Sequence, residues 1–196
     1  MVILFFKPYG VLSQFSEGGR WKTLAQYGPF PRGVYAAGRL DADSEGLLVL
    51  TDDNTIKTRL GDPRYAHERT YLVQVERVPS AGTLHRLRSG ISLEGRRTRP
   101  ATVRLLPGAP ELPPRPVPIR FRKNIETAWI ELTITEGRNR QIRRMTAAVG
   151  HPTLRLLRMR MGTLTLKGLA PGETRVLTQH EVQHLRHSLG IIRPDR

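Results

Sequence analysis

The chain has 196 residues, enough for one or two domains, and carries 32 Lys and Arg residues against 17 Asp and Glu residues, a formal net charge of +15. Such a surplus favours a polyanionic partner, in a cell most often a nucleic acid, although a general compositional bias toward arginine is the alternative explanation. The absence of cysteine excludes disulfides, thiolate catalysis and cysteine-based zinc sites.

The first predicted element is a short apolar strand at residues 2–6, closed by the turn sequence KPYG. No basic region precedes this run and no small-residue cleavage site follows it, so it is not typical of a signal peptide. No window of the chain approaches the ~20 apolar residues that span a bilayer. We therefore expect a soluble, cytoplasmic protein without a membrane partner.

Short elements follow. Apolar runs at residues 34–37 and 47–51 predict strands on either side of an acidic turn, and a capped helix is predicted within residues 52–63. A further helix is predicted at residues 80–87, where Ser80 is its cap. Residues 107–118 are rich in proline and are predicted to form an extended surface loop.

Two segments alternate between apolar and polar residues and predict strands. Residues 70–76 place Tyr71, Val73 and Val75 on one face, and Leu72 indicates that the other face is partly covered. Residues 129–135 alternate as well, with Ala128, Ile130, Leu132 and Ile134 on the buried face.

The last third of the chain adds two helices and a strand. After the segment EGRN, at residues 136–139, the apolar period becomes helical, with Ile142, Met145 and Val149 on one stripe. A strand is predicted at residues 154–165 and a last helix at residues 181–189. Strands that follow one another in this way favour a mixed α/β protein with a largely antiparallel sheet.

Several acids gather around the turn in the sequence GRLDADSEGLLVLTDD at residues 38–53, within a basic chain. Asp43 and Glu45 have the composition of solvated turn residues. Asp52 and Asp53 precede a helix and are predicted to cap it.

Asp41 differs from these acids because it follows Arg39 just past a strand end. The local sequence alone leaves two interpretations open. Asp41 is either another turn residue or the reacting carboxylate of an enzyme that acts on a polyanion.

The segment EGRNRQIRRM, at residues 136–145, brings Arg140, Arg143 and Arg144 to one side of a helix. A solvated basic face is one explanation. The arginines lie in the first turns, however, where the helix dipole already favours anions, so they need negative partners. A buried Arg143 beside the apolar stripe would need a carboxylate, and Asp41 is a candidate.

Five motifs occur in the order of a known family. They are KPYG, AAGRLDADSEGLLVLT, RTYLVQV, EGRNRQIRRM and GHPTLRLLRMRMG. Together they resemble the small-subunit type of ribosomal pseudouridine synthases, with Arg69 at a position where lysine is more usual. The resemblance is collinear from about residue 2 to residue 178.

The resemblance implies an α+β (mixed α/β) pseudouridine synthase fold, with a largely antiparallel central sheet, flanking helices and a catalytic cleft. A catalytic domain is expected over residues 1–178, open to division into two subdomains. A C-terminal helix and tail are expected over residues 179–196, without the S4-type RNA-binding domain that members usually carry at the N-terminus.

Site residues are also implied by the resemblance. Asp41 would be the essential carboxylate, Tyr71 the tyrosine beneath the target base, and Arg143 the cation paired with Asp41. Arg39 would help to displace or replace the flipped nucleotide. Four other cations are expected to meet RNA phosphates: Lys7, Arg138, Arg140 and Arg144. Lys7 could equally be a turn lysine.

The expected reaction is the isomerisation of one uridine of large-subunit (23S) ribosomal RNA to pseudouridine, by a monomer that requires no cofactor and no metal. The RNA would be naked or partly assembled into the subunit. Alternatives are the same chemistry on small-subunit RNA and a non-catalytic RNA-binding assembly protein. A glycoside hydrolase that uses Asp41 and Asp43 fits bond cleavage but not the charge of the chain.

Overall fold

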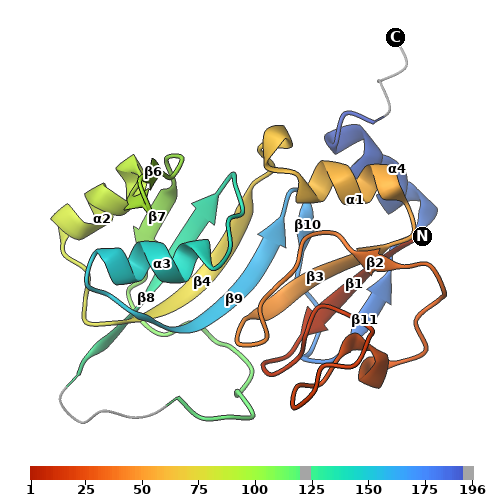
Figure 1. The fold of residues 1–196 in the computed structure, drawn as a ribbon, viewed down its shortest axis with the longest axis horizontal. Helices are drawn as coiled ribbons and strands as arrows, with labels where there is room; N and C mark the ends of the chain where they lie inside the picture. Colours follow the sequence, from red (N-terminus) through yellow and green to blue (C-terminus); the bar gives the residue numbers. More distant parts are fainter. Residues whose placement is uncertain (120–124, 192–196) are drawn as a thin grey trace.

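The computed structural model describes residues 1–119 and 125–191 (Figure 1). The strands are β1 (Val2–Lys7), β2 (Tyr35–Ala36), β3 (Glu45–Thr51), β4 (Arg69–Glu76), β5 (Ser92–Leu93), β6 (Arg96–Arg97), β7 (Thr102–Leu105), β8 (Thr127–Ile134), β9 (Thr153–Met161), β10 (Leu164–Thr165) and β11 (Thr174–Val176). The α-helices are α1 (Asn54–Gly61), α2 (Ala81–Ser89), α3 (Gln141–Ala148) and α4 (Gln179–Ser188).

One central sheet runs through the molecule in the order β11-β1-β3-β9-β4-β8-β7, and β2 and β10 pair with β3 and β9. Its pairs are antiparallel except for β3 with β9, and β5 and β6 form a separate hairpin. The largely antiparallel sheet with flanking helices confirms the predicted α+β class.

The sequence of β1 does not alternate between apolar and polar residues. All six of its residues are buried, because Val2, Leu4 and Phe6 pack into one apolar cluster while Ile3 and Phe5 pack into another on the opposite face. A strand covered on both faces reads as a continuous apolar run.

Helices α2 and α3 cover one face of β4, β8 and β7 (Figure 1). Ile142 and Met145 of α3 contact the cluster that holds Val73 and Val75, as the helical stripe and the strand alternation predicted. Leu72 points the other way and packs against the second cluster. The predicted caps Ser80 and Asp53 are confirmed, since each side chain accepts backbone N–H bonds at the start of its helix. Asp52 is not a cap but forms an ion pair with the amino terminus.

The parallel contact between β3 and β9 joins the two halves of the sheet. Glu45 lies opposite Leu157 and Gly46 opposite Arg158. A Cβ on Gly46 would lie 2.3 Å from the carbonyl oxygen of Arg158, and its φ of 103° disfavours other residues. Glycine therefore permits the close approach that brings the 38–44 turn beside β9.

Some predicted elements differ from the structure. The strand predicted at residues 154–165 is interrupted, since β9 ends at Met161 and β10 begins at Leu164. The β5–β6 hairpin, β7 and β11 were not predicted, because strands of two to four residues are too short to show a clear alternation. The expected C-terminal tail falls largely on residues 192–196, outside the described residues. Among the helices of the described chain, none has the length and apolar character to cross a bilayer.

Candidate active site

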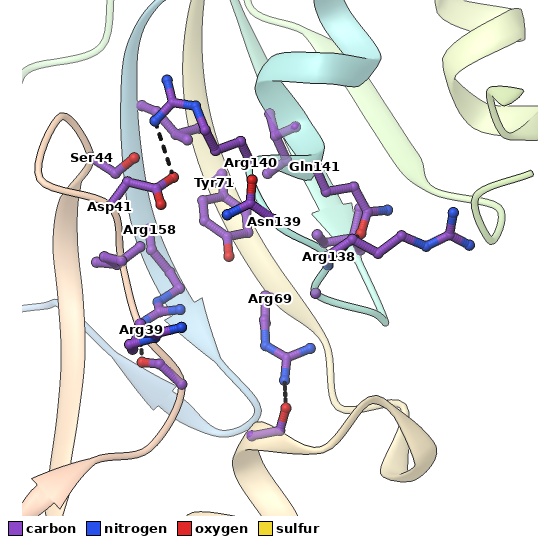
Figure 2. Close-up of a pocket in the computed structure, with 17 residues that line it drawn as sticks. Arg39, Asp41, Ser44, Arg69, Tyr71, Arg138, Asn139, Arg140, Gln141 and Arg158 are labelled. Atoms are coloured by element: carbon purple, nitrogen blue, oxygen red, sulfur yellow. Dashed lines mark hydrogen bonds and ion pairs between the residues drawn. The ribbon is translucent and has the colours of Figure 1, made fainter. Parts of the chain in front are cut away.

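A pocket of about 280 Å³ opens between the 38–44 turn and the start of α3 (Figure 2). Strands β4 and β9 contribute Tyr71 and Arg158 to its wall. Among the described residues that line it, Asp41 supplies the one carboxylate. The pocket therefore combines segments that are far apart in the sequence around a single acid.

The turn that carries Asp41 is fixed by hydrogen bonds from the loop that follows β1. The Ser13 hydroxyl donates to the carbonyl of Leu40 at 2.8 Å and accepts from its N–H at 3.0 Å. The Gly10 N–H donates to the carbonyl of Ala42 at 2.8 Å. These contacts hold the backbone on both sides of Asp41, so its carboxylate has a defined position.

The Asp41 side chain is 37% exposed and points into the pocket, where its Oδ2 lies 3.5 Å from Nη1 of Arg140 (Figure 2). Arg140 begins α3 from a left-handed backbone conformation with a φ of 48°. Arg140 therefore places a positive charge directly beside the carboxylate of Asp41.

Asp43 organises the cations beside Asp41. Its carboxylate accepts from Nη1 and Nη2 of Arg140 at 3.0 and 2.8 Å, and Arg143 donates to its backbone carbonyl at 2.7 Å. Burial by itself would raise the pKa of Asp43, but the Arg140 hydrogen bonds and the charge of Arg143 outweigh burial and lower that pKa. Asp43 thus holds two arginines at the entrance while it stays ionised.

Tyr71 faces the pocket from β4 and is 7% exposed. Its register partner across the sheet is Arg158 of β9, at a point where the pairing shifts by one residue. Arg158 is fully buried and donates from Nε to the carbonyl of Leu47 at 2.7 Å. An aromatic ring and a guanidinium therefore line the pocket; in Figure 2 Tyr71 lies to the right of Asp41 and Arg158 lies below it.

Two buried polar atoms of this pocket have no hydrogen-bond partner within the described part of the chain. They are the Oγ of Ser44, next to the Asp41 turn, and Nη1 of Arg69 on β4. Buried donors are rarely left unpaired. No group of three His, Cys, Asp or Glu residues that could hold a metal occurs within residues 1–119 and 125–191.

Comparison with known proteins relates this pocket to a family. The family model described as RNA pseudouridylate synthase matches residues 1–148. The chain belongs to the RNA pseudouridylate synthase family.

Relatives extend the match over nearly the whole chain. Ribosomal large subunit pseudouridine synthase E of Xanthomonas axonopodis pv. citri (strain 306) is 58% identical over 87% of this chain and 90% of that protein. The protein of the same name from Xanthomonas campestris pv. campestris is 55% identical, over 90% of this chain and 95% of that protein. A crystal structure of pseudouridylate synthase superposes with a TM-score of 0.77 at 31% identity, covering 94% of this chain and 73% of that one.

In this pseudouridylate synthase the structure brings together most of the predicted site. Five of the predicted residues line the pocket: Arg39, Asp41, Tyr71, Arg138 and Arg140. Their predicted roles remain proposals. The other three predicted residues, Lys7, Arg143 and Arg144, lie outside the lining.

The partner predicted for Asp41 needs correction. Arg143 pairs with Asp43, with its Nε 3.4 Å from Oδ2, and Arg140 takes the place beside Asp41. The reason is geometric, since Arg143 lies in the first turn of α3 and reaches the carbonyl and carboxylate of Asp43. Both arginines do have carboxylate partners, as their place at the helix start requires.

Two acids predicted as solvated turn residues are held by arginines instead. Glu45 is 3% exposed, begins β3, and forms a paired hydrogen bond with Arg155. Asp43 lies in the turn but is held by Arg140 and Arg143. The turn composition was read correctly for Asp43, whereas Glu45 belongs to a strand, and the arginine partners of both acids lie about a hundred residues away in the sequence.

Arg138 and Arg144 have protein partners in the structure. Arg138 donates to the carbonyls of Arg96 and Arg97 at 3.2 and 2.8 Å, and Arg144 pairs with Glu94 at 2.8 Å. Both arginines therefore tie the region of α3 to the β5–β6 hairpin. In Figure 2 the side chain of Arg138 points away from Asp41.

The expected phosphate contact of Lys7 has to be corrected, because its side chain is fully buried. Nζ donates to the carbonyls of Pro8 and Val11 at 3.1 and 2.6 Å, and so holds the KPYG turn. Burial lowers the pKa of Lys7 from an ordinary value near 10.5 to about 7, although the charges of Glu45 and Asp43 favour the ammonium form.

This burial predicts a pH-dependent stability. Between pH 7 and 10.5 the unfolded chain binds a proton at Lys7 that the folded chain has released, so the free energy of unfolding rises with pH. We expect the wild-type protein to gain about 1 kcal/mol per pH unit relative to Lys7→Met across this window. Urea unfolding of both proteins at pH 7 and pH 9 measures the difference. A difference that does not change with pH would contradict the prediction.

Sequence reasoning missed Arg69, Ser44 and Arg158 as pocket residues. A signal for Arg69 exists, because it lies two positions before Tyr71 in an alternating strand and so shares its face. No comparable signal exists for Ser44, whose burial follows from the packing of the turn against β9.

Proposed function

We propose that the protein converts a uridine of large-subunit ribosomal RNA to pseudouridine, with Asp41 as the reacting carboxylate. The observation that carries this proposal is the single carboxylate of the described pocket lining, held beside Arg140 in a pocket that an inward-facing tyrosine also lines. The names of the relatives that are 52–58% identical support the choice of large-subunit RNA.

The chemistry requires few groups. The reaction breaks the bond between N1 of uracil and C1′ of the ribose, turns the ring, and joins C5 to C1′. A carboxylate that attacks the sugar or the base, or removes the C2′ proton, must be ionised. Arg140 and Arg143 place positive charge on the side of Asp41 that faces α3.

The target base must leave its stack to reach this pocket, at a cost of a few kcal/mol. Tyr71 can offset part of that cost, because stacking of a base on an aromatic ring is worth ~1–3 kcal/mol. Arg39 is exposed at the pocket and is positioned to fill the space that the everted nucleotide leaves in the RNA. We also propose that the enzyme acts as a monomer in the cytoplasm.

Mapping of pseudouridine in ribosomal RNA tests this function. RNA from cells that lack the protein should lack one pseudouridine of the large subunit, and the purified protein should restore it on naked or partly assembled RNA. Loss from small-subunit RNA would instead assign the substrate to that subunit. An unchanged map in cells, with no product in vitro, would favour a non-catalytic RNA-binding protein.

Phosphate contacts should make RNA binding strongly dependent on salt. Because the chain has a formal net charge of +15, we expect the RNA association constant to fall steeply as salt is added. A plot of the logarithm of this constant against the logarithm of the salt concentration should have a slope of about −3 or steeper. The measurement uses Asp41→Asn protein, so that the RNA is not converted during titration. A nearly flat dependence would contradict a phosphate-dominated interface.

A further inference from the structure

Arg69 is a buried cation of the pocket to which the proposed function assigns no role. It begins β4 two residues before Tyr71, so both side chains share one face of the strand. Arg69 is 4% exposed and lines the pocket. Figure 2 shows it below Tyr71, on the side to which the phenol oxygen points.

One end of the Arg69 guanidinium has a structural role. Nη2 donates to the carbonyls of Leu60 and Gly61 at 2.7 and 3.1 Å, which belong to the last turn of α1. The final carbonyls of a helix lack partners within the helix, and a cation there is also attracted by the partial negative charge of the helix C-terminus. This contact explains a positive charge at position 69, but it uses only Nη2.

Nη1 is left over. It is buried and has no hydrogen-bond partner, and none of the ion pairs among the described residues includes Arg69. Its charged neighbour Arg158 is repulsive, and burial together with that repulsion lowers the pKa of Arg69. An unsatisfied buried donor is costly, and the cost disappears if a bound molecule provides an acceptor.

We infer that Arg69 recognises the uracil ring, with Nη1 donating a hydrogen bond to one of its carbonyl oxygens, O2 or O4. This inference rests on the proposed function and extends it to base recognition. The depth of Arg69 favours a base over a phosphate, because the everted base enters the pocket while the RNA backbone stays near the exposed Arg39 and Arg140. Nη1 is covered in the structure, so the contact requires a small shift of the guanidinium as the base enters.

The same contact assists the reaction. When the bond between C1′ and N1 breaks, its electron pair stays with the uracil and the negative charge spreads to O2 and O4, while Asp41 compensates the electron deficiency at the sugar. The bond between C1′ and C5 then forms, and the proton lost from C5 is balanced by one gained at N1. A fixed cationic donor at a carbonyl oxygen stabilises the charge that develops in this step.

Thio-substituted RNA tests the contact at the level of atoms. Sulfur is a weaker hydrogen-bond acceptor than oxygen. The test places 4-thiouridine or 2-thiouridine at the mapped target. The wild-type enzyme should convert the RNA about 10-fold more slowly when the sulfur replaces the carbonyl oxygen that Arg69 contacts. In Arg69→Met, turnover of unmodified RNA should fall about 10- to 100-fold, and the same thio substitution should have little further effect. Arg69→Lys, which keeps a cationic donor, should restore most of the turnover and the thio sensitivity.

Gly137→Ala provides a variant that leaves the α1 contact intact. Its Cβ would lie 3.8 Å from Nη1, an ordinary contact, and should partly shield this atom without changing the unfolding midpoint. We expect slower turnover and a smaller thio effect. Equal thio effects in wild type, Arg69→Met and Gly137→Ala, for both sulfur positions, would overturn the inference. Wild-type protein that forms no pseudouridine would instead overturn the proposed function.

Discussion

Replacement of Asp41 by asparagine should reduce pseudouridine formation by about 10³-fold or more, because the amide keeps the shape of the side chain but cannot act as a carboxylate nucleophile or base. The backbone contacts of Ser13 and Gly10 with the turn do not involve the side chain, so the variant should fold normally. Single-turnover conversion of ribosomal RNA measures the loss. RNA affinity should be unchanged or higher, since removal of a negative charge cannot weaken phosphate binding.

The matched control for this result is Asp52→Asn. Asp52 is also half-exposed and ion-paired, but its partner is the amino terminus and it lies outside the pocket. It undergoes the same change of charge and should retain wild-type turnover. Turnover by Asp41→Asn at a rate close to that of the control would exclude a reacting role for Asp41.

Glu45→Ala should be the most destabilising of the charge substitutions considered. Glu45 and Arg155 are 3% and 8% exposed and form two hydrogen bonds of 2.9 and 2.8 Å. Removal of the acid leaves Arg155 buried without its counter-charge and also withdraws a favourable charge from the buried Lys7. Loss of one member of a buried pair costs about 3–5 kcal/mol. Urea unfolding of the purified variant measures this loss.

Two further variants separate burial from charge. Glu131→Ala breaks a pair with Arg104 in which the side chains are 38% and 62% exposed, and should cost less than about 1 kcal/mol. The double variant Glu45→Leu with Arg155→Met should recover much of the stability, because no buried charge is left unpaired. A loss for Glu45→Ala no larger than that for Glu131→Ala would show that Arg155 finds adequate solvation without its partner.

The predictable part of the fold follows from local periodicity. Residues 70–76 and the stripe of Ile142 and Met145 were assigned to the correct faces because alternation and helical spacing reflect burial directly. The same alternation placed Tyr71 inward. The caps Ser80 and Asp53 were predictable because a cap depends on residues within one turn.

The unpredicted part depends on distant partners. No local pattern distinguishes Arg140 from Arg143 as the partner of Asp41, because the choice is set by the left-handed backbone at Arg140 and by the position of Asp43. Lys7 was mistaken for a surface cation because a lysine beside Pro and Gly is usually solvated. Its burial follows from strands on both sides of β1, which only the sheet order reveals.

Several contacts around Asp41 connect residues separated by 97 to 111 positions, from Asp43 with Arg140 to Arg158 with Leu47. Contacts of such high sequence separation form slowly, because a long loop must close before they contribute. The chain therefore has no functional centre until β9 has entered the sheet beside β3. Catalytic activity consequently reports the completion of folding. A polypeptide truncated before β9 would contain the GRLD turn but would lack the strand that completes the pocket.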